Sequence, residues 1–225
     1  MPRNRLLNSL STDIGQLVTP HLESVYLERG KELHRLGEQV HWVYFPEDCL
    51  ISLVVLLERG TSVEATTVGN DGFAGYSPIF GHEDADITAV VQIAGDCLRM
   101  EVTAFSALLK NDEFFRLAGG YVGEVLAATA QSVACMALHP VSERLARWLL
   151  QVRDATERDE LPLTQEFLAT MLGVYRPTVT VAIRTLESAG LIGHRRGLIR
   201  ILDGDGLAEA SCECYRQEVK RSAVK

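Results

Sequence analysis

The residues best suited to chemistry in this sequence are cations and small polar side chains towards its C-terminal end. Arg176 is followed by Thr180, Val181 and Arg184, a spacing that places all four on one side of a helix. A guanidinium can read the edge of a guanine, a hydroxyl can bond to a phosphate, and an isopropyl group can pack on a thymine methyl. No carboxylate follows until Glu187. These residues predict a surface that reads duplex DNA.

A second basic group follows this surface in the chain. His194, Arg195 and Arg196 lie between the mainly apolar residues 191–192 and 198–202, and a glycine comes directly after them. Runs of β-branched residues joined by a glycine-containing turn are typical of a hairpin. Its cations could reach backbone phosphates, as the wing of a winged helix-turn-helix does. An ordinary helix pair with a hairpin is the alternative, but it leaves the adjoining cationic surfaces unexplained.

Two helices must position the predicted DNA surface. The first is expected between Thr164, a favoured N-cap residue, and Gly173, which accepts the positive φ common after a helix. The second begins at Arg176, because the proline after it is tolerated only in a first turn. The apolar residues expected in the core are Leu163, Phe167, Leu168, Met171 and Leu172, and then Val179, Ile183 and Leu186. The residues expected to contact DNA are Thr164, Gln165, Arg176, Pro177, Thr178, Thr180, Val181, Arg184, His194, Arg195 and Arg196.

Charge is distributed unevenly along the 225 residues. The net charge of −8 would disfavour DNA binding if it were uniform. Residues 1–161 carry 13 basic and 23 acidic side chains, a net charge of −10, whereas residues 162–225 carry 9 and 7, a net charge of +2. Between residues 163 and 200 there are five arginines and two glutamates. The predicted DNA surface is therefore locally basic on an acidic body.

The cysteines and histidines indicate no enzyme and no metal. Five cysteines, an odd number, suit a reducing compartment, so we expect a cytoplasmic protein. Cys212 and Cys214 could hold a metal, but no second pair lies nearby in the sequence, so we expect two thiols on a helix surface. His34, His41 and His82 lack metalloenzyme spacing. No cofactor is expected, although a haem held by His82 or a cysteine, or another small-molecule effector, stays open.

Between residues 24 and 102 the sequence changes character. Short runs rich in Val, Leu, Ile, Thr and Tyr alternate with turn signals such as Arg29-Gly30 and Gly95-Asp96. Short strands at near-regular spacing predict an antiparallel β-roll. A leading helix is expected over residues 3–18, with Leu6, Leu7, Leu10, Ile14 and Leu17 on its apolar face.

Residues 112–138 are predicted to form one long helix. Between residues 117 and 142 only Glu124 is charged, too little for a helix with one side in water. A membrane span is the second choice, because glycines and polar residues interrupt the apolar run. A homodimer fits better, with one side of the helix on its own roll and the other on the partner's helix. The residues expected along the dimer helix are Leu117, Tyr121, Val125, Ala128, Val133 and Met136.

A break is predicted at His139-Pro140, because the residue before a proline avoids the α region. The expected domains are a sensor roll with its leading helix at 1–111, the dimerisation helix at 112–138, a hinge at 139–140 and a DNA-binding domain at 141–225. Within the last, we expect an amphipathic helix over residues 141–156, a solvated loop over 153–160 and a polar surface helix over 206–220.

Residues 163–192 resemble, without a gap, the DNA-binding unit of the Crp-Fnr superfamily of transcription regulators, and the rest of the chain resembles it more loosely. The resemblance implies an α+β architecture: an N-terminal jelly roll like a cyclic-nucleotide-binding domain, a long dimerisation helix, and a C-terminal winged helix-turn-helix. In the cyclic-AMP branch the recognition helix opens Arg-Glu-Thr-Val and has another Arg further on. Only Arg176 carries over as a base reader, because Pro177 replaces the Glu and Val181 replaces the second Arg.

The resemblance also implies a phosphate-binding cassette at residues 72–76. Tyr76 stands where cyclic-nucleotide binders have Glu, Ile87 where they have Arg, and Ala130 where the dimer helix has Ser. Without the Glu and the Arg a cyclic phosphate would be desolvated without partners, so we expect no response to cyclic AMP. The degenerate pocket comprises Gly72, Gly75, Tyr76, Ile87, Thr88 and Thr129. No cysteine precedes Cys49, so the N-terminal iron-sulfur cluster of the oxygen-sensing branch is not expected.

Together these features predict a cytoplasmic transcription regulator that binds a palindromic operator as a homodimer. Its partners would be double-stranded DNA, a second copy of the chain and RNA polymerase, with no membrane. The alternative is a small-molecule-binding or metabolic β-roll protein that dimerises through its helices and does not bind DNA. Duplex binding distinguishes the two.

Overall fold

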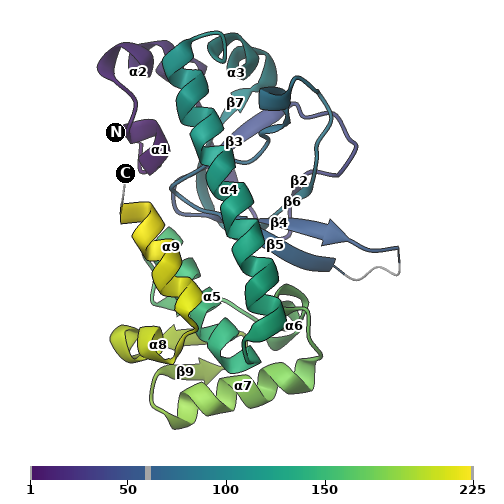
Figure 1. Ribbon diagram of the computed structural model, residues 1–225, viewed down its shortest axis with the longest axis vertical. Coiled ribbons are helices and arrows are strands. Elements are labelled where there is room, and N and C mark those ends of the chain that lie inside the picture. The colour runs from purple at the N-terminus through teal and green to yellow at the C-terminus, as the bar shows by residue number, and fades with distance from the viewer. Residues whose placement is uncertain (1, 59–61, 224–225) are drawn as a thin grey trace. The chain divides into compact units, whose positions relative to one another are not determined.

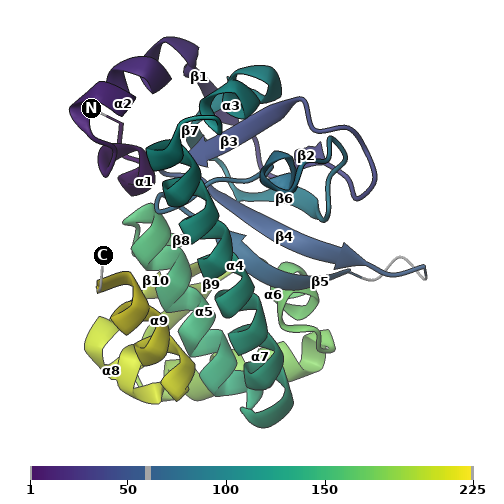
Figure 2. The ribbon, with the colours of Figure 1, turned by 45° about the horizontal axis from the view of Figure 1, so that its top comes forward.

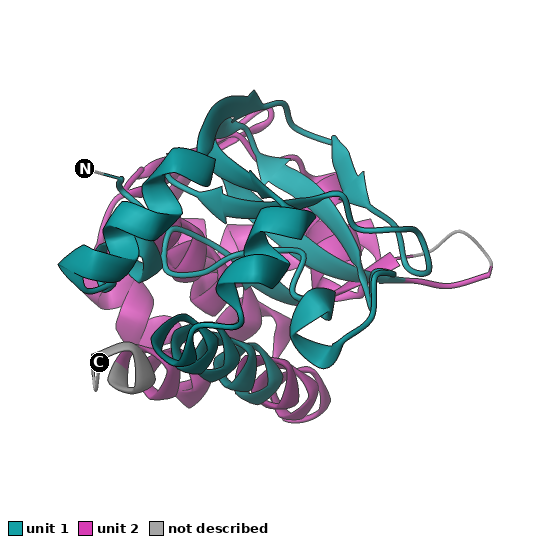
Figure 3. Ribbon diagram, turned by 90° about the horizontal axis from the view of Figure 1, so that it is seen from above, with its two compact units in different colours: residues 1–55, 66–127 teal, residues 56–65, 128–225 magenta. Residues whose placement is uncertain are grey.

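The computed structural model describes residues 2–58 and 62–223, with side chains up to residue 219. Figure 1 traces the chain from its N-terminus to its C-terminus, and Figure 3 colours the two compact units that it forms. Unit 1 comprises residues 1–55 and 66–127, and unit 2 comprises residues 56–65 and 128–225. The long helix α4 (Asp112–Leu138) contributes residues to both units. The domain limits drawn from the sequence remain predictions.

The predicted antiparallel roll is present, and its strands can be followed in Figure 2. One sheet has the strand order β1-β7-β3 and the other the order β2-β6-β4-β5. In the first sheet Val25 pairs with Cys97 and Val43 with Met100. The strands are β1 (Glu23–Leu27), β2 (Glu32–His34), β3 (Trp42–Pro46), β4 (Leu50–Leu56), β5 (Ser62–Val68), β6 (Thr88–Ile93) and β7 (Gly95–Glu101).

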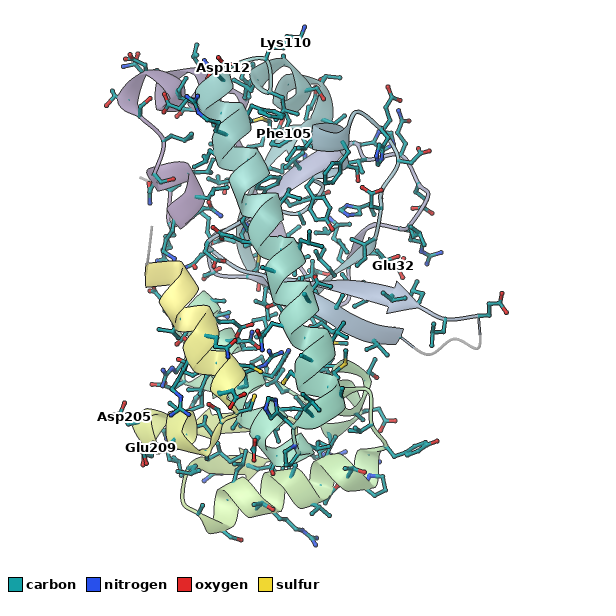
Figure 4. All side chains as sticks on the ribbon, viewed as in Figure 1. Glu32, Phe105, Lys110, Asp112, Asp205 and Glu209 are labelled. Atoms are coloured by element: carbon teal, nitrogen blue, oxygen red, sulfur yellow. The ribbon has the colours of Figure 1, made fainter. Side chains whose placement is uncertain are left out.

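Aromatic rings form the centre of the unit 1 core. The ring of Phe73 lies 5.5 Å from that of Phe45, 5.4 Å from Phe105 on α3 (Val102–Leu108), and 4.9 Å from Tyr121 on α4. Figure 4 labels Phe105. All four side chains are buried, and tilted rings at these distances attract one another beyond their burial. This cluster joins the loop after β5 to the first half of α4.

The prediction of a single leading helix over residues 3–18 is wrong. The segment forms two helices, α1 (Arg5–Asn8) and α2 (Thr12–Val18), followed by the 3-10 turn η1 (Thr19–His21). The Ser11 hydroxyl accepts a hydrogen bond from the Ile14 amide, so a new helix starts there. Leu7 and Ile14 are buried as expected, but Leu17 is exposed.

Helix α4 confirms the prediction of one helix over residues 112–138, and the structure shows which of the residues named along it face the roll. Tyr121 is only 6% exposed, and Val125 packs on the roll core, so these two face the chain's own roll. Leu117 and Ala128 are half-buried. The large exposed apolar residues of α4 are Phe115, Leu126, Val133, Met136 and Leu138. The periodicity alone did not separate the two sides, because both are apolar.

Helix α4 is long and apolar enough to span a membrane by length and composition alone. It is the only such helix in the part of the chain that is described. A soluble helix covered on both sides has the same composition. The aromatic contacts of Tyr121 show that one side of the helix is covered by protein.

Unit 2 contains a small sheet with the strand order β8-β10-β9 and helices around it. Two corrections apply here. Glu160, the last residue of the predicted loop, forms a short strand with Leu161, which pairs with Ile199. The predicted helix over residues 206–220 is two helices that break at Ser211 and Cys212. The elements are α5 (Val141–Thr156), β8 (Glu160–Leu161), α6 (Gln165–Leu172), α7 (Arg176–Ser188), β9 (Ile192–Arg195), β10 (Leu198–Ile201), α8 (Gly204–Ala210) and α9 (Glu213–Ala223).

Candidate nucleic-acid interface

Helix α6 begins and ends where the sequence predicted. The Thr164 hydroxyl accepts a hydrogen bond from the Phe167 amide at 3.2 Å, which satisfies one of the free donors at the helix start. Gly173 follows the helix in the left-handed conformation, with φ +62°. The turn at Val174 and Tyr175 then leads into α7. The helix-turn-helix geometry therefore follows from two local sequence signals.

Helix α7 has one buried and one exposed side (Figure 1). Val179, Ala182, Ile183 and Leu186 are buried. The exposed side presents the predicted contact residues Arg176, Pro177, Thr178, Val181 and Arg184. The exposed isopropyl group of Val181, between two arginines, does not contribute to the core. It could pack on a thymine methyl group in the DNA groove.

Two of the predicted contact residues touch each other across the helix pair. The Thr180 hydroxyl donates to Gln165 Oε1 at 2.8 Å, so Gln165 at the start of α6 is held against α7. Arg176 Nε lies 3.7 Å from Oε2 of Glu166, also on α6. Glu166 is an acidic neighbour that the sequence analysis missed. Only the folded helix pair brings it to the head of α7.

The predicted hairpin is formed by β9 and β10. Leu198 pairs with Arg195 and Ile199 with His194, and Gly197 makes the turn with φ +74°. Arg195 and Arg196 are exposed, whereas His194 is half-buried. Glu187 Oε1 accepts a hydrogen bond from the His194 amide at 2.9 Å, which ties the hairpin to the end of α7. The two cationic surfaces therefore belong to one packed body.

Two further residues extend this interface. Tyr175, at the N-cap position of α7, is 86% exposed, and an aromatic ring at the head of the helix could pack on sugar and phosphate. Arg200 on β10 is exposed and lies 3.8 Å from Glu160 on β8. The feature of the sequence that points to Tyr175 is its position between Gly173, which ends α6, and Arg176, which begins α7.

The predicted cassette forms a tight, mostly buried loop in unit 1. A Cβ on Gly72 would lie 2.0 Å from the Tyr121 ring, and Gly75 has φ +93°, so both positions need glycine. Tyr76 and Ile87 pack on the roll core as partly buried apolar groups. Burial raises the pKa of Tyr76, which keeps its hydroxyl neutral. Thr88 is buried, and its hydroxyl accepts a hydrogen bond from the Leu36 amide.

Thr129 lies on the part of α4 that belongs to unit 2, so its predicted role beside the cassette remains a prediction. The histidines of the roll are dispersed in unit 1. His34 is buried, whereas His41 and His82 are exposed, and His82 Nδ1 lies 3.5 Å from Asp86.

Comparison with known proteins identifies the C-terminal part of the chain. Residues 143–210 match the family model of the Crp-like helix-turn-helix domain. The chain carries a Crp-like helix-turn-helix domain. The matched segment contains every residue that was predicted to contact DNA. No curated protein matches the chain in sequence.

Solved structures share the fold over most of both chains. A transcriptional regulator of the CRP/FNR family from Thermus thermophilus is 24% identical, with a TM-score of 0.68, over 84% of this chain and 98% of that chain. FixK2 from Bradyrhizobium japonicum is 14% identical, with a TM-score of 0.69, over 85% and 98%. The c-di-GMP responsive regulator CLP from Xanthomonas campestris is 14% identical, with a TM-score of 0.67, over 85% and 99%. The chain therefore has the Crp/Fnr fold, with a roll, a long helix and a helix-turn-helix region.

The comparisons thus show a Crp-like helix-turn-helix domain over residues 143–210 and the Crp/Fnr fold over most of the chain. Within the matched residues, α7 is the second helix of the helix-turn-helix, and the β9-β10 hairpin follows it.

Proposed function

We propose that this protein regulates transcription by binding a specific duplex sequence through α7, with the β9-β10 hairpin on the neighbouring backbone. The observation that carries the proposal is the exposed side of α7, on which Arg176, Val181 and Arg184 lie and no carboxylate precedes Glu187 in the last turn of the helix. Guanidinium groups can read guanine and bind phosphate. The hairpin adds Arg195 and Arg196 for the backbone.

We further propose that the active form is a homodimer and that its operator is palindromic. Leu126 is 71% exposed and Val133 is 61% exposed on α4, which leaves apolar surface uncovered in a single chain. A second copy of α4 would cover it by two-fold symmetry. Two recognition helices would then read two half-sites about one helical turn apart, and each half-site would contribute affinity.

The sensor roll is proposed not to bind cyclic AMP or cyclic GMP. Tyr76 and Ile87 offer an aromatic ring and an aliphatic group where a cyclic nucleotide needs a carboxylate and a guanidinium. Losing two charge-assisted hydrogen bonds of about 1.5–3 kcal/mol each implies roughly two to four decades of affinity. Calorimetric titration of each cyclic nucleotide into the protein tests this. A dissociation constant below about 50 μM would mean that the roll is a nucleotide site after all.

Contact with RNA polymerase and a cytoplasmic location are part of the same proposal, since a transcription regulator works where the DNA is. Under the alternative, a metabolic or small-molecule-binding roll protein, the helices of unit 2 would serve only for dimerisation. The basic side of α7 and the basic hairpin favour the regulator, because a dimer interface has no need of exposed cations.

The experiment that tests the proposed function is a gel-shift selection on random duplexes, with cell extract added or omitted. We expect enrichment of an inverted repeat, either in both arms or only with extract, where an effector is supplied. If the enriched pool stays random in both arms, the regulator is excluded and the alternative is favoured.

A further inference from the structure

Four potential metal ligands from two distant segments come together in unit 2. Cys135 and His139 lie at the end of α4, and Cys212 and Cys214 lie at the junction of α8 and α9. One ligand atom from each residue lies within 4.8 Å of the other three. All three cysteines are buried and form their own small cluster. The expectation that Cys212 and Cys214 are surface thiols is therefore wrong.

We propose that these four residues form a mononuclear zinc site. Tetrahedral coordination with Zn–S bonds of about 2.3 Å and Zn–N bonds of about 2.0–2.1 Å separates two sulfurs by about 3.8 Å and a sulfur from a nitrogen by about 3.6 Å. Cys135 Sγ lies 3.5 Å from Cys212 Sγ, and Cys214 Sγ lies 3.6 Å from His139 Nδ1. Both measured distances are close to edges of that tetrahedron.

The types of the four ligands and the short distances between them favour a single zinc ion. Three thiolates and one imidazole are soft and intermediate ligands, which favour zinc over magnesium or calcium. An iron-sulfur cluster places its own iron and sulfide atoms between the cysteines, so its ligands lie further apart than these do. The three thiols would lose three protons when the ion binds, and the site would carry a net charge of −1 with a neutral histidine.

Surrounding side chains are arranged as a zinc site requires. Gln131 Nε2 donates to Cys214 Sγ at 3.0 Å, a bond that suits a thiolate better than a thiol. His139 Nε2 lies 3.9 Å from Glu213 Oε1, and metal-binding histidines commonly pair their other nitrogen with a carboxylate.

A buried cation lies beside the cluster as well. Arg147 is 8% exposed, its Nη1 lies 3.6 Å from Glu218 Oε1, and neither Nε nor Nη1 has a hydrogen-bond partner in the described part of the chain. The same small pocket is lined by Cys135, Arg144 and Arg147. Two arginines in a buried site are stabilised by anionic groups nearby. Glu218 is one such group and Glu64, which also lines the pocket, is another; a zinc site with three thiolates would add further negative charge.

The position of the ligands in the sequence suggests what the metal does. Cys135 and His139 come directly before the Crp-like domain at 143–210, and Cys212 and Cys214 come directly after it. An ion bound to all four would join both ends of that domain. Closing so long a loop restricts the unfolded chain more than the folded one, so zinc would stabilise unit 2.

Metal analysis of the full-length protein, purified without chelator under reducing conditions, tests the site. We expect about one equivalent of zinc per chain, as four ligands imply. Cobalt should replace it with the visible ligand-field bands of a tetrahedral thiolate site. The Cys135→Ser and Cys212→Ser variants should lose the metal, whereas Cys49→Ala, which removes a buried thiol of unit 1, should keep it. Circular dichroism of each variant separates metal loss from unfolding.

Milder changes keep the proposal testable if the cysteine variants do not fold. Gln131→Leu and Glu213→Gln should weaken zinc binding by about 10- to 100-fold, measured against a competing chelator. Removal of zinc from the wild-type protein should lower its melting temperature. Wild-type protein that binds no zinc, that contains iron and sulfide instead, or that forms a Cys135–Cys212 disulfide seen by mass spectrometry would overturn the proposal.

Discussion

Arg176 Nε lies 3.7 Å from Oε2 of Glu166, so the arginine at the start of α7 has an acidic partner on the preceding helix, α6. Both side chains are more than half exposed, so the pair contributes little to stability. Its importance is for binding, because a guanidinium that turns to a base or a phosphate must leave Glu166. The Glu166 carboxylate would also repel the phosphates of a duplex bound at this surface.

Replacing Glu166 with Gln should therefore strengthen DNA binding. An exposed ion pair is worth about 0.2–1 kcal/mol, so freeing Arg176 should increase affinity by up to about five-fold per half-site. The free energy of unfolding should change by less than about 0.5 kcal/mol, as for most surface substitutions. Fluorescence anisotropy with a selected duplex measures the first, and urea unfolding the second. Weaker binding would instead give Glu166 a positive role, such as accepting a hydrogen bond from cytosine.

Arg195→Ala should weaken binding to every duplex alike. The side chain lies exposed on the hairpin, where we expect a phosphate contact and no base contact. Each phosphate contact contributes about 0.9 to the slope of log affinity against log salt concentration, so the slope should fall by about 1 per half-site. A salt titration with a selected and a shuffled duplex gives both slopes. A loss confined to the selected duplex would mean that Arg195 reads a base.

A charge on the outer side of α4 should separate the dimer. Leu126→Arg or Val133→Arg puts a guanidinium into the proposed seam, where it has no partner, and we expect monomers with lost operator binding. Ser106→Arg on α3, also at an exposed position, is the matched control and should change neither property. Light scattering after size exclusion measures the mass. A wild-type monomer at micromolar concentration would contradict the dimer.

His34 should make stability depend on pH. It is buried on β2, its Nδ1 has no hydrogen-bond partner, and burial lowers its pKa to about 4. In the unfolded chain His34 is protonated below about pH 6.5, whereas in the folded chain it stays neutral down to about pH 4. The free energy of unfolding therefore falls as pH drops from about 6.5 to about 4. At pH 5 the loss should be about 2 kcal/mol in the free energy of unfolding.

Urea unfolding at pH 7 and pH 5 measures this loss. His34→Leu should flatten the difference between the two pH values, whereas His41→Gln, at an exposed position, should preserve it. An equal difference in wild type and His34→Leu would assign the pH dependence to other groups.

Local signals predicted much of the DNA-binding region. The caps at Thr164 and Gly173 and the proline after Arg176 define α6 and α7, because helix ends depend on nearby residues. Contacts between segments that are distant in the sequence could not be predicted from such local signals. Glu166 reaches Arg176 only in the folded pair, and Cys135 lies 77 residues from Cys212.

The dimer helix shows a different limit of sequence reasoning. Its length followed from the missing charges, but its two sides are equally apolar, so the sequence did not show that Tyr121 lies on the side that packs on the roll, against Phe73. Likewise the break at Ser211 and Cys212 lacks a proline or glycine, and a polar run on both sides concealed it.

The most direct test of the central claim compares wild type and Arg176→Ala by anisotropy, on the selected operator and on a shuffled duplex, at one salt concentration. An arginine-guanine contact is worth about 1–3 kcal/mol, and two-fold symmetry doubles it, so operator affinity should fall by at least about 30-fold. Affinity for the shuffled duplex should change far less, and circular dichroism and mass should match those of the wild type. Unchanged affinity for the operator would contradict the assignment of α7 to the DNA groove.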